Sequence, residues 1–203
     1  MDSAVSSEPR LTQGFFARDT VTVARDLLGR RLVRNLGGER LSGLIVETEA
    51  YVGESDTACH ASRGRTPRTQ VMYGPPGRYY VYLIYGIHCM LNIVTAAEGE
   101  PEAVLIRGLL PREGVERMRR LRGGAPSKRL ADGPGKLCQA LAVDRSLNGA
   151  PVESDELWLE EGVGVPPKRI LASPRVGIGY ASEEDQQRRW RFHLDPAYIS
   201  TGR

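Results

Sequence analysis

The chain has 203 residues, of which 40% are hydrophobic and 26% are charged, and this composition is that of an ordinary globular protein. The length suits one well-buried domain. No apolar run approaches the roughly 20 residues that cross a bilayer, and three widely spaced cysteines favour reduced thiols over a disulfide framework. Because the N-terminus lacks a basic segment followed by an apolar stretch, we expect a cytoplasmic protein without a membrane anchor.

The net charge of +3 hides an uneven distribution. The basic residues are 25 Arg and 3 Lys, and the planar guanidinium of arginine suits phosphate, although genome base composition also enriches arginine. Seven basic and two acidic residues lie between Arg112 and Arg129, whereas Glu153–Glu161 holds five acids and no base. One face of the fold is therefore expected to be strongly positive.

The chain in order predicts many strands and few helices. Residues 1–13 are expected to form a flexible arm and residues 14–203 a single domain. Asp19 favours the start of a short helix that ends at Leu28. Gly37-Gly38 favour a hairpin turn between strands at Arg31–Asn35 and Arg40–Tyr51, and a loop over Val52–Gly77 follows.

The second half of the chain continues the same pattern. We expect strands at Arg78–Tyr85, His88–Thr95, Ala103–Leu109, Leu157–Glu160, Arg169–Ala172, Val176–Tyr180 and Arg189–Leu194, and helices at Glu113–Arg122 and Pro134–Val143. The sequence therefore predicts the α+β class: a single domain built on a curved, mostly antiparallel β-sheet with a few surrounding helices.

The strand that ends at Tyr51 has an unusual face. Its residues alternate, so that the even positions from Leu44 to Ala50 form a core face, while Glu47, Glu49 and Tyr51 lie on the other face. A carboxylate in such a strand is most often part of a salt bridge. Arg107, in another strand, could pair with Glu49, and a carboxylate held ionised in this way can deprotonate a water. Glu47 and Glu49 could instead form the acid/base pair of a carbohydrate hydrolase.

A long segment without carboxylates follows this strand. From Ala61 to Ala97 there is no Asp or Glu, while Arg63, Arg65, Arg68 and Arg78 are interleaved with Tyr73, Tyr79, Tyr80, Tyr82 and Tyr85. Positive charge beside flat rings indicates an anionic partner with stackable groups, which means nucleic acid. A lone tyrosine is usually a core residue, but Tyr51, Tyr80 and Tyr82 together with His60 could form the walls of a pocket for a planar base.

Two shorter features complete the pattern. Cys59-His60 lacks the spacing of a metal site, so we expect no metal. Tyr85 and Ile87 flank Gly86 at the turn of the hairpin, where small polar residues are normal. Such an apolar tip is either covered by the fold or enters a partner, as the wedges of proteins that open DNA do.

These residues resemble a known family. The similar segments are Val46–Tyr51, Cys59-His60, Gly77–Gly86, Leu91–Ile93, Val104–Arg107, Gly135–Leu141 and Arg175–Gly179. In this order they resemble the alkyladenine (3-methyladenine) DNA glycosylase family, from about residue 20 to about residue 200. The resemblance implies a base-excision repair enzyme that flips alkylated or deaminated purines out of duplex DNA. It hydrolyses the N-glycosidic bond with a water activated by a glutamate and leaves an abasic site.

The resemblance also implies roles for individual residues. Glu49 resembles the general base, and Arg107 and the backbone carbonyl of Val176 resemble the groups that hold the water. The base pocket is implied to consist of Tyr51, His60, Tyr82 and Asn92, with Asn92 as a steric gate against guanine and the backbone N–H of His60 reading the base edge. Tyr85 resembles the residue that intercalates in the DNA. Contacts to the DNA backbone or minor groove are expected from Arg65, Thr66, Ile87, His88 and Lys136.

Ile87 and His88 depart from the mammalian pattern of this family. This departure bears on the preference for the DNA sequence around the lesion and not on the chemistry. The short N-terminal arm, without the extension of animal members, indicates a bacterial protein. We expect a monomer that acts on damaged double-stranded DNA without a cofactor. It should have no lyase activity, because Lys128 and Lys168 lie in polar segments and Lys136 suits a phosphate contact. A non-catalytic module that binds damaged DNA or RNA is the remaining alternative.

Overall fold

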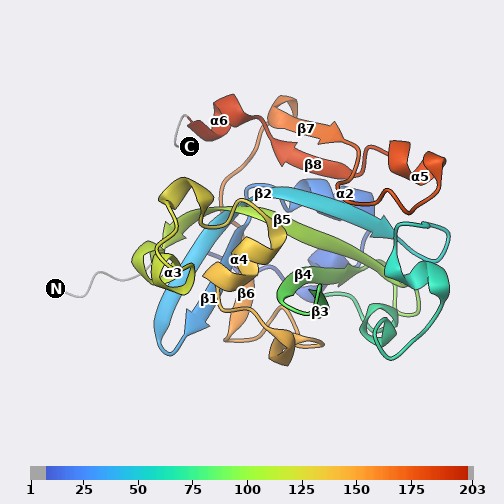
Figure 1. The fold of residues 1–203 in the computed structure, drawn as a ribbon, viewed down its shortest axis with the longest axis horizontal. Coiled ribbons are helices and arrows are strands. Elements are labelled where there is room, and N and C mark those ends of the chain that lie inside the picture. The colour runs from blue at the N-terminus through green and yellow to red at the C-terminus, as the bar shows by residue number, and fades with distance from the viewer. Residues whose placement is uncertain (1–7, 201–203) are drawn as a thin grey trace.

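The computed structural model describes residues 8–200 (Figure 1). Its strands are β1 (Arg31–Leu36), β2 (Glu39–Val52), β3 (Tyr79–Ile84), β4 (His88–Thr95), β5 (Glu102–Glu113), β6 (Leu157–Glu160), β7 (Ile170–Ser173) and β8 (Arg191–Leu194). Its α-helices are α1 (Gln13–Phe16), α2 (Thr20–Asp26), α3 (Val115–Leu121), α4 (Pro134–Ala140), α5 (Glu183–Gln187) and α6 (Pro196–Ser200). Short 3₁₀ helices are η1 (His60–Arg63), η2 (Gln70–Tyr73), η3 (Ser127–Arg129), η4 (Arg145–Leu147) and η5 (Pro167–Arg169).

All strands belong to one open sheet in which neighbours pair antiparallel. The order is β3-β4-β5-β2-β1-β6, and β8 joins β2 and carries β7 on its other side. The sheet is strongly twisted, and the helices lie around it (Figure 1). The predicted fold class, an α+β domain on a mostly antiparallel sheet, is confirmed.

β2 is the central strand, and it changes partners along its length. Its first half lies between β1 and β5, and its second half lies between β8 and β5. The change occurs at a β-bulge, since Ile45 pairs with Leu109 and Glu47 with Gly108, which leaves Val46 as the extra residue. A bulge bends its strand and increases the local twist. It therefore separates the two halves of the sheet here.

Helices lie on both sides of the sheet. α2 packs on β2 and β5, where the Thr48 hydroxyl donates to the carbonyl of Ala24 at 2.7 Å. Thr48 and Ala50 are buried as predicted, but the bulge at Val46 breaks the alternation, so Val46 is only partly buried and the odd position Ile45 belongs to the core. α4 packs on β4 and β5 on the opposite side and stands in front of the sheet in Figure 1. Among the described residues, no helix is long and apolar enough to cross a membrane.

Two differences from the predicted elements arise at glycines. The expected strand over Val176–Tyr180 is wrong, because this segment is a loop in which Gly177 has a φ of +77°. The predicted helix at Glu113–Arg122 begins later, at Val115, because Glu113 still belongs to β5 and Gly114 turns the chain with a φ of +66°. Both errors come from glycines whose positive φ interrupts a regular pattern.

The expected N-terminal arm is described only in part, since residues 1–7 lie outside the described residues. Leu11 is buried, and its N–H donates to the carbonyl of Leu159 at 2.9 Å. Arg10 forms an ion pair with Asp155 and lies over the Trp158 ring. The last residues of the arm thus pack against β6.

Candidate active site

Two bulges aim the charged residues of β2 and β5 toward each other. Besides the bulge in β2, the pairing shifts from Glu47–Gly108 to Thr48–Ile106, which makes Arg107 the extra residue on β5. Bulges next to functional sites commonly re-aim a side chain. The Arg107 guanidinium reaches both carboxylates: Nε lies 3.0 Å from Glu47 Oε1, and Nη1 lies 3.3 Å from Glu49 Oε2. The pairing that the sequence suggested between Arg107 and Glu49 is present.

The carboxylate of Glu49 is fully buried and accepts hydrogen bonds on both oxygens. The N–H of Val176 donates to Oε1 at 2.7 Å, and the hydroxyl of Tyr51 donates to Oε2 at 2.8 Å. These donors come from a loop far along the chain and from the same face of β2, two residues on. They fix the orientation of the carboxylate.

Burial raises the pKa of Glu49 above its ordinary value, although the charge of Arg107, the Val176 N–H and the Tyr51 hydroxyl all act to lower it. The sequence had indicated that Arg107 would hold this pKa down. The charge of Arg107 does lower the pKa, but the net shift is upward, because the carboxylate is completely removed from solvent and desolvation outweighs the three favourable partners.

The pKa of Glu47 is shifted in the opposite direction, below its ordinary value. Burial alone would raise its pKa, but the hydrogen bond from Arg191 and the charge of Arg107 outweigh burial and lower the pKa. Its Oε1 accepts from Arg191 Nε at 2.6 Å as well as from Arg107. Glu47 is therefore ionised at neutral pH and is not suited to act as a proton donor.

A cleft of about 680 Å³ opens beside this carboxylate cluster, and a deeper pocket of about 40 Å³ adjoins it. Tyr51, His60 and Tyr82 line both spaces, and Asn92 lines the deeper one. Arg107 and Val176 line the cleft. The structure thus brings together the residues expected for a base pocket and the residues expected around the carboxylate.

The aromatic walls are held in place by their own contacts. The His60 and Tyr82 rings meet edge to face, with centroids 4.5 Å apart, and His60 Nδ1 lies 2.9 Å from the hydroxyl of Tyr80. Burial, followed by the nearby charges of Arg68 and Arg63, lowers the pKa of His60 to about 4. The imidazole is therefore neutral at physiological pH and adds no positive charge to the pocket.

Asn92 lies at the pocket wall with only 3% of its surface exposed. Its Nδ2 donates to the backbone carbonyl of Tyr80 at 3.1 Å, across the β3–β4 pair. The amide thus satisfies a backbone group and at the same time contributes to the shape of the pocket.

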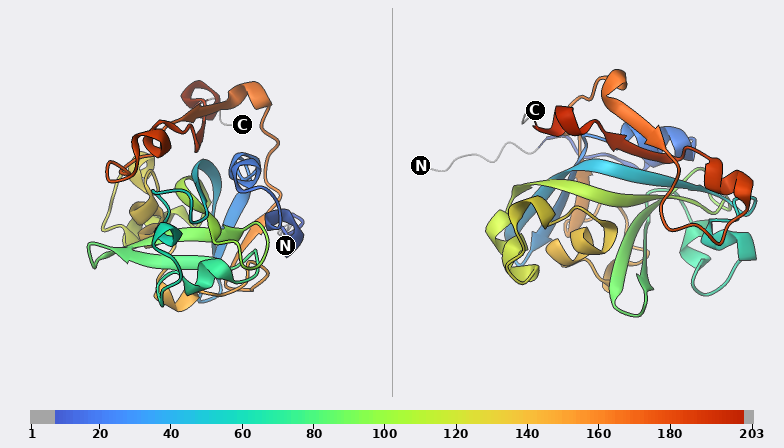
Figure 2. Two further views of the ribbon diagram at one scale, coloured as in Figure 1. Left: turned by 90° about the vertical axis from the view of Figure 1, so that its right-hand side faces the viewer. Right: turned by 45° about the horizontal axis from the view of Figure 1, so that its top comes forward.

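The β3–β4 hairpin stands out from the body of the protein (Figure 2). At its tip, Tyr85 is 87% exposed and Ile87 is 74% exposed. Tyr85 and Gly86 both have positive φ, and the N–H of Ile87 donates to the carbonyl of Ile84, so these two residues are the central residues of a β-turn. A tyrosine with φ +52° is strained, and strain of this kind concentrates at functional positions.

The remaining residues expected at DNA lie around the same opening. Thr66 lines the cleft, His88 is exposed beside the hairpin tip, and Arg65 lies outside the cleft over the ring of Tyr73. Lys136 stands in the first turn of α4 and forms an ion pair of 2.8 Å with Asp132. Gly135, next to it, is so close to His88 that a Cβ would lie 3.2 Å from the His88 Cβ.

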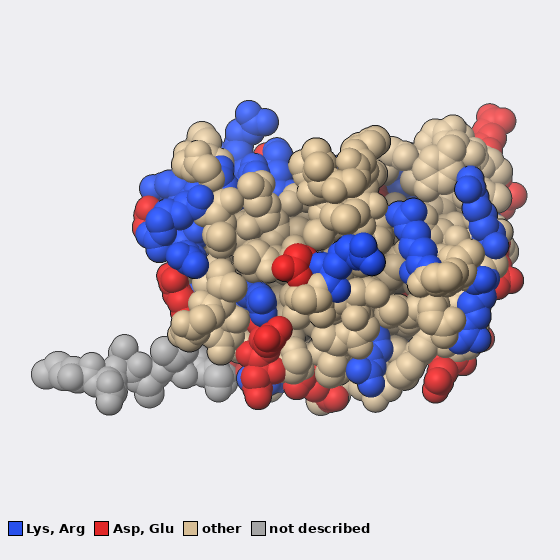
Figure 3. Space-filling model, turned by 60° about the horizontal axis from the view of Figure 1, so that its bottom comes forward, with Lys and Arg blue, Asp and Glu red and all other residues tan. Residues whose placement is uncertain are grey.

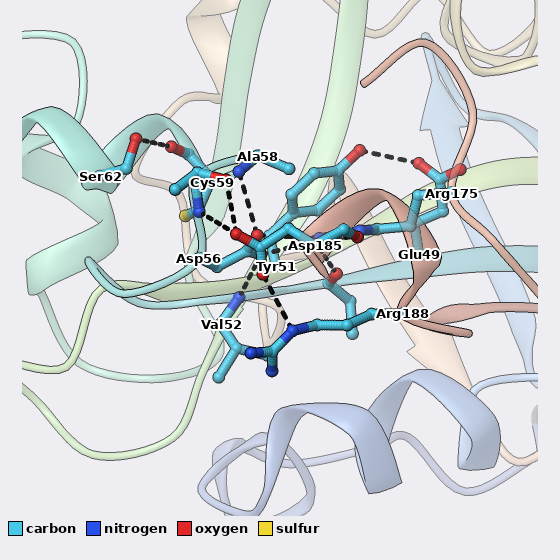
Figure 4. A network of polar contacts seen from close by, with 12 residues as sticks. Glu49, Tyr51, Val52, Asp56, Ala58, Cys59, Ser62, Arg175, Asp185 and Arg188 are labelled. Carbon is cyan, nitrogen blue, oxygen red and sulfur yellow. Dashed lines mark hydrogen bonds and ion pairs between the residues drawn. The ribbon is translucent and has the colours of Figure 1, made fainter. Parts of the chain in front are cut away.

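Sequence reasoning missed a buried ion pair that supports the site (Figure 4). Arg175 donates to both carboxylate oxygens of Asp56, at 2.5 and 2.8 Å, and both side chains are at most 1% exposed. The guanidinium also donates to the carbonyl of Ala50 and lies between the Tyr51 and Trp190 rings. Arg175 thereby holds the Tyr51 ring and the adjacent Val176 N–H, which are the two neutral donors to Glu49.

Tyr180 was also missed, because it seemed to end a strand. It is 67% exposed, lines both the cleft and the deeper pocket, and donates its hydroxyl to the carbonyl of Ala58 at 2.9 Å. Its ring therefore spans the mouth of the pocket. The sequence drew attention to Tyr51 and to the run of tyrosines between Ala61 and Ala97, and Tyr180 lies far from both.

Metal ligands and reactive thiols do not gather in the described residues. No three His, Cys, Asp or Glu side chains there are placed to hold a metal ion. Cys59 beside the pocket is buried, and burial raises the pKa of its thiol to about 12, so it stays protonated.

These features define an α+β domain with an aromatic-walled cleft and a buried carboxylate, Glu49, beside it. The family model for methylpurine-DNA glycosylase (MPG) matches residues 14–197. The chain belongs to this family. Family membership supports a DNA glycosylase function in base-excision repair.

Individual relatives agree over nearly their whole length. A protein of Methanocella arvoryzae is 54% identical over 187 residues, covering 91% of this chain and 92% of that protein. Relatives from Desulfitobacterium hafniense and Myxococcus xanthus are 46% and 47% identical, covering 94% and 95% of this chain and 98% and 94% of theirs. Each is provisionally named a 3-methyladenine DNA glycosylase.

Proposed function

We propose that this protein is a monofunctional DNA glycosylase that removes 3-methyladenine and related alkylated or deaminated purines from duplex DNA. The observation that carries the proposal is the Glu49 carboxylate, fully buried beside a cleft with aromatic walls and fixed by Arg107, Tyr51 and the Val176 N–H. Nucleic acid fits the cleft because arginines lie around flat rings.

In the proposed reaction, Glu49 takes a proton from a water that attacks the anomeric carbon of the sugar. Burial raises the pKa of Glu49, so the ionised carboxylate is a stronger proton acceptor than an exposed one. Arg107 and the carbonyl of Val176 are the groups proposed to hold the water. The base leaves with the bonding electrons of the N-glycosidic bond.

The aromatic pocket suits a damaged purine. A purine methylated on a ring nitrogen is cationic, and a cation stacks favourably on tyrosine faces. His60 is neutral, so it does not repel the cation. A cationic base is also a good leaving group and needs no proton from the enzyme. This agrees with a site in which Glu49 acts as a base and Glu47, held ionised between two arginines, is not a proton donor.

The base must first leave the duplex, at a cost of a few kcal/mol. Tyr85, exposed and strained at the hairpin tip, is proposed to fill the gap. Damaged bases pair and stack less well, so selectivity begins at this step.

The absence of a lyase step is also part of the proposal. A lyase needs an amine to form a Schiff base with the sugar. None of the residues around the cleft is a lysine, and the amine of Lys136 is paired with Asp132.

The test is to incubate the protein with methylated duplex DNA and to separate the products. We expect free 3-methyladenine and an abasic site with an uncut backbone, and no covalent adduct after borohydride treatment. Lesion binding without base release would identify a binding module. Release of sugars from oligosaccharides, with none from DNA, would identify a carbohydrate hydrolase that uses Glu47 and Glu49.

The pH dependence of excision is expected to follow Glu49. As the pH falls through its pKa, the carboxylate takes up a proton and the rate drops. Because burial raises this pKa, the drop should begin at a higher pH than the ordinary value of 4.5 would give. Arg107→Met removes a charge that lowers the pKa, so its acidic limb should move to higher pH. Single-turnover rates of both proteins from pH 4.5 to 8 test this, and coincident limbs would contradict it.

Asn92→Ser is expected to relax selectivity against guanine. The shorter side chain leaves room for the exocyclic amine, and the loss of one small group in a fitted pocket changes discrimination by roughly tenfold. Removal of 7-methylguanine relative to 3-methyladenine should therefore rise. The paired measurement is the thermal midpoint, because loss of the bond to Tyr80 also weakens the β3–β4 pair. An unchanged ratio with lower stability would make Asn92 a purely structural residue.

Tyr85→Ala is expected to weaken binding to lesion-containing duplex more than binding to undamaged duplex, because only the flipped state has a gap to fill. The loss should be about 1–3 kcal/mol, the scale of one aromatic–base stack. Because the side chain is 87% exposed, the fold should be unaffected. Equal losses on both duplexes would argue against the wedge role. Fluorescence anisotropy at fixed salt measures both affinities.

A further inference from the structure

A second groove, of about 410 Å³, lies along the free edge of β3, outside the base pocket. β3 is the terminal strand in the sheet order, so its outer edge has no strand neighbour. Arg68 from the loop after η1 lines one part of the groove, and Arg145 and Asn148 from η4 and its end line another.

The backbone of β3 is only partly covered along this edge. Near its start, Tyr79 exchanges hydrogen bonds with the backbone of Gly149 and Ala150, and the N–H of Val81 donates to Asn148 Oδ1 at 2.9 Å. Since outward-facing positions recur every second residue, the next N–H on this edge is that of Leu83. In residues 8–200 it has no hydrogen-bond partner, so it remains available as a donor in the groove.

The charged residues of the groove are also available. Arg68 and Arg145 are both exposed, and neither forms an ion pair with a carboxylate of the described residues. Asp144, the acid next to Arg145, accepts hydrogen bonds from the N–H and hydroxyl of Ser146 and so caps η4. Arg68 lies over the Tyr82 ring at 5.0 Å. Figure 3 shows the side that lies at the bottom of Figure 1, where Lys and Arg side chains stand out across the face.

The hairpin separates this groove from the cleft. Arg68 and Tyr82 line both spaces, whereas Leu83 and Arg145 line only the groove and Tyr85 lines only the cleft. Both grooves therefore run beside the strand that ends in the exposed tip. A duplex that receives this tip has one backbone on each side of the inserted residue.

We propose that the β3-edge groove binds the phosphodiester backbone of the undamaged strand, while the cleft takes the damaged strand. The inference rests on the proposed function. Two guanidinium groups without a carboxylate partner among the described residues and a free backbone N–H are donors that suit a phosphate oxygen. Arg145 and Leu83 line only the groove, so this part of the groove contributes to binding of the duplex and not to the chemistry.

The test compares Arg145→Gln with Arg25→Gln, which removes the same charge from an exposed arginine on α2, behind the sheet in Figure 1. Arg145→Gln should weaken binding to lesion-containing duplex about two- to fivefold at low salt, the scale of one exposed ionic contact. Its log–log salt dependence should be less steep by about 0.9. Arg25→Gln should match wild type in both measurements.

The strand is assigned with neutral methylphosphonate linkages. Placed in the undamaged strand opposite the lesion, they should weaken wild-type binding and weaken binding of Arg145→Gln less, because only Arg68 and the Leu83 N–H remain in the variant. Coupling to linkages in the damaged strand would overturn the assignment, and equal behaviour of the two arginine variants would overturn the groove itself. Excision by wild-type protein is measured on the same duplexes, so that a failure of the glycosylase proposal is seen separately.

Discussion

Glu49→Gln is expected to lower the single-turnover rate of base excision by about 10²–10⁴-fold, the range for loss of a general base. The amide nearly preserves the shape of the side chain but does not take up a proton from water at neutral pH. Because Val176, Tyr51 and Arg107 all donate to the carboxylate, one of them will face the amide nitrogen, so some loss of stability is also expected. Lesion binding should be largely kept, which anisotropy measures on the same sample.

Glu47→Gln is the matched control, since it removes a neighbouring carboxylate from the same strand face. Its partners are Arg107 and Arg191, both on the sheet, and the charge of Glu47 raises the pKa of Glu49. We expect less than a tenfold loss of rate, mostly through stability. Loss of excision in Glu47→Gln with a normal rate in Glu49→Gln would show that the wrong carboxylate has been assigned.

Asp56→Ala is expected to destabilise the fold by about 3–5 kcal/mol, because it leaves the buried guanidinium of Arg175 without its carboxylate. The variant should also weaken the hydrogen bonds to Glu49, since Arg175 lies against Tyr51 and precedes Val176, whose N–H donates to Glu49. Urea unfolding measures the first effect. The acidic limb of the excision rate measures the second, and it should move to higher pH as Glu49 loses donors.

The control for this pair is the double variant Asp56→Leu/Arg175→Met. Removing both charges avoids an unpaired buried ion. The double variant should therefore be more stable than a variant that lacks only the Asp56 carboxylate or only the Arg175 guanidinium. A cost of less than about 1 kcal/mol for Asp56→Ala would mean that the ion pair contributes little to the fold.

Local patterns in the sequence predicted the strands and the face of β2 that carries Glu47, Glu49 and Tyr51, because side chains alternate strictly along a strand. The hairpin was equally predictable from its turn at Gly86, whereas Tyr85 and Ile87 left open whether the tip is covered or exposed. The pocket roles came from a resemblance to a family, since periodicity does not bring His60 and Asn92 to one place.

Other features depend on distances along the chain that no local pattern records. The bulge that aims Arg107 follows from the pairing of two strands more than 50 residues apart, as the Cα partners Thr48 and Ile106 show. Arg175 pairs with Asp56, which is 119 residues away in the sequence. The raised pKa of Glu49 results from complete burial, which becomes visible only when the loop that contains Val176 is in place.

The most direct test of the account is a crystal structure of Glu49→Gln bound to duplex DNA with one ethenoadenine. We predict that the damaged base lies outside the helix, stacked between Tyr51 on one side and His60 and Tyr82 on the other, with Tyr85 in the gap that it leaves. The anomeric carbon should then face the amide of residue 49. A base that remains stacked in the duplex, or that is rotated out with its sugar away from residue 49, would contradict the account.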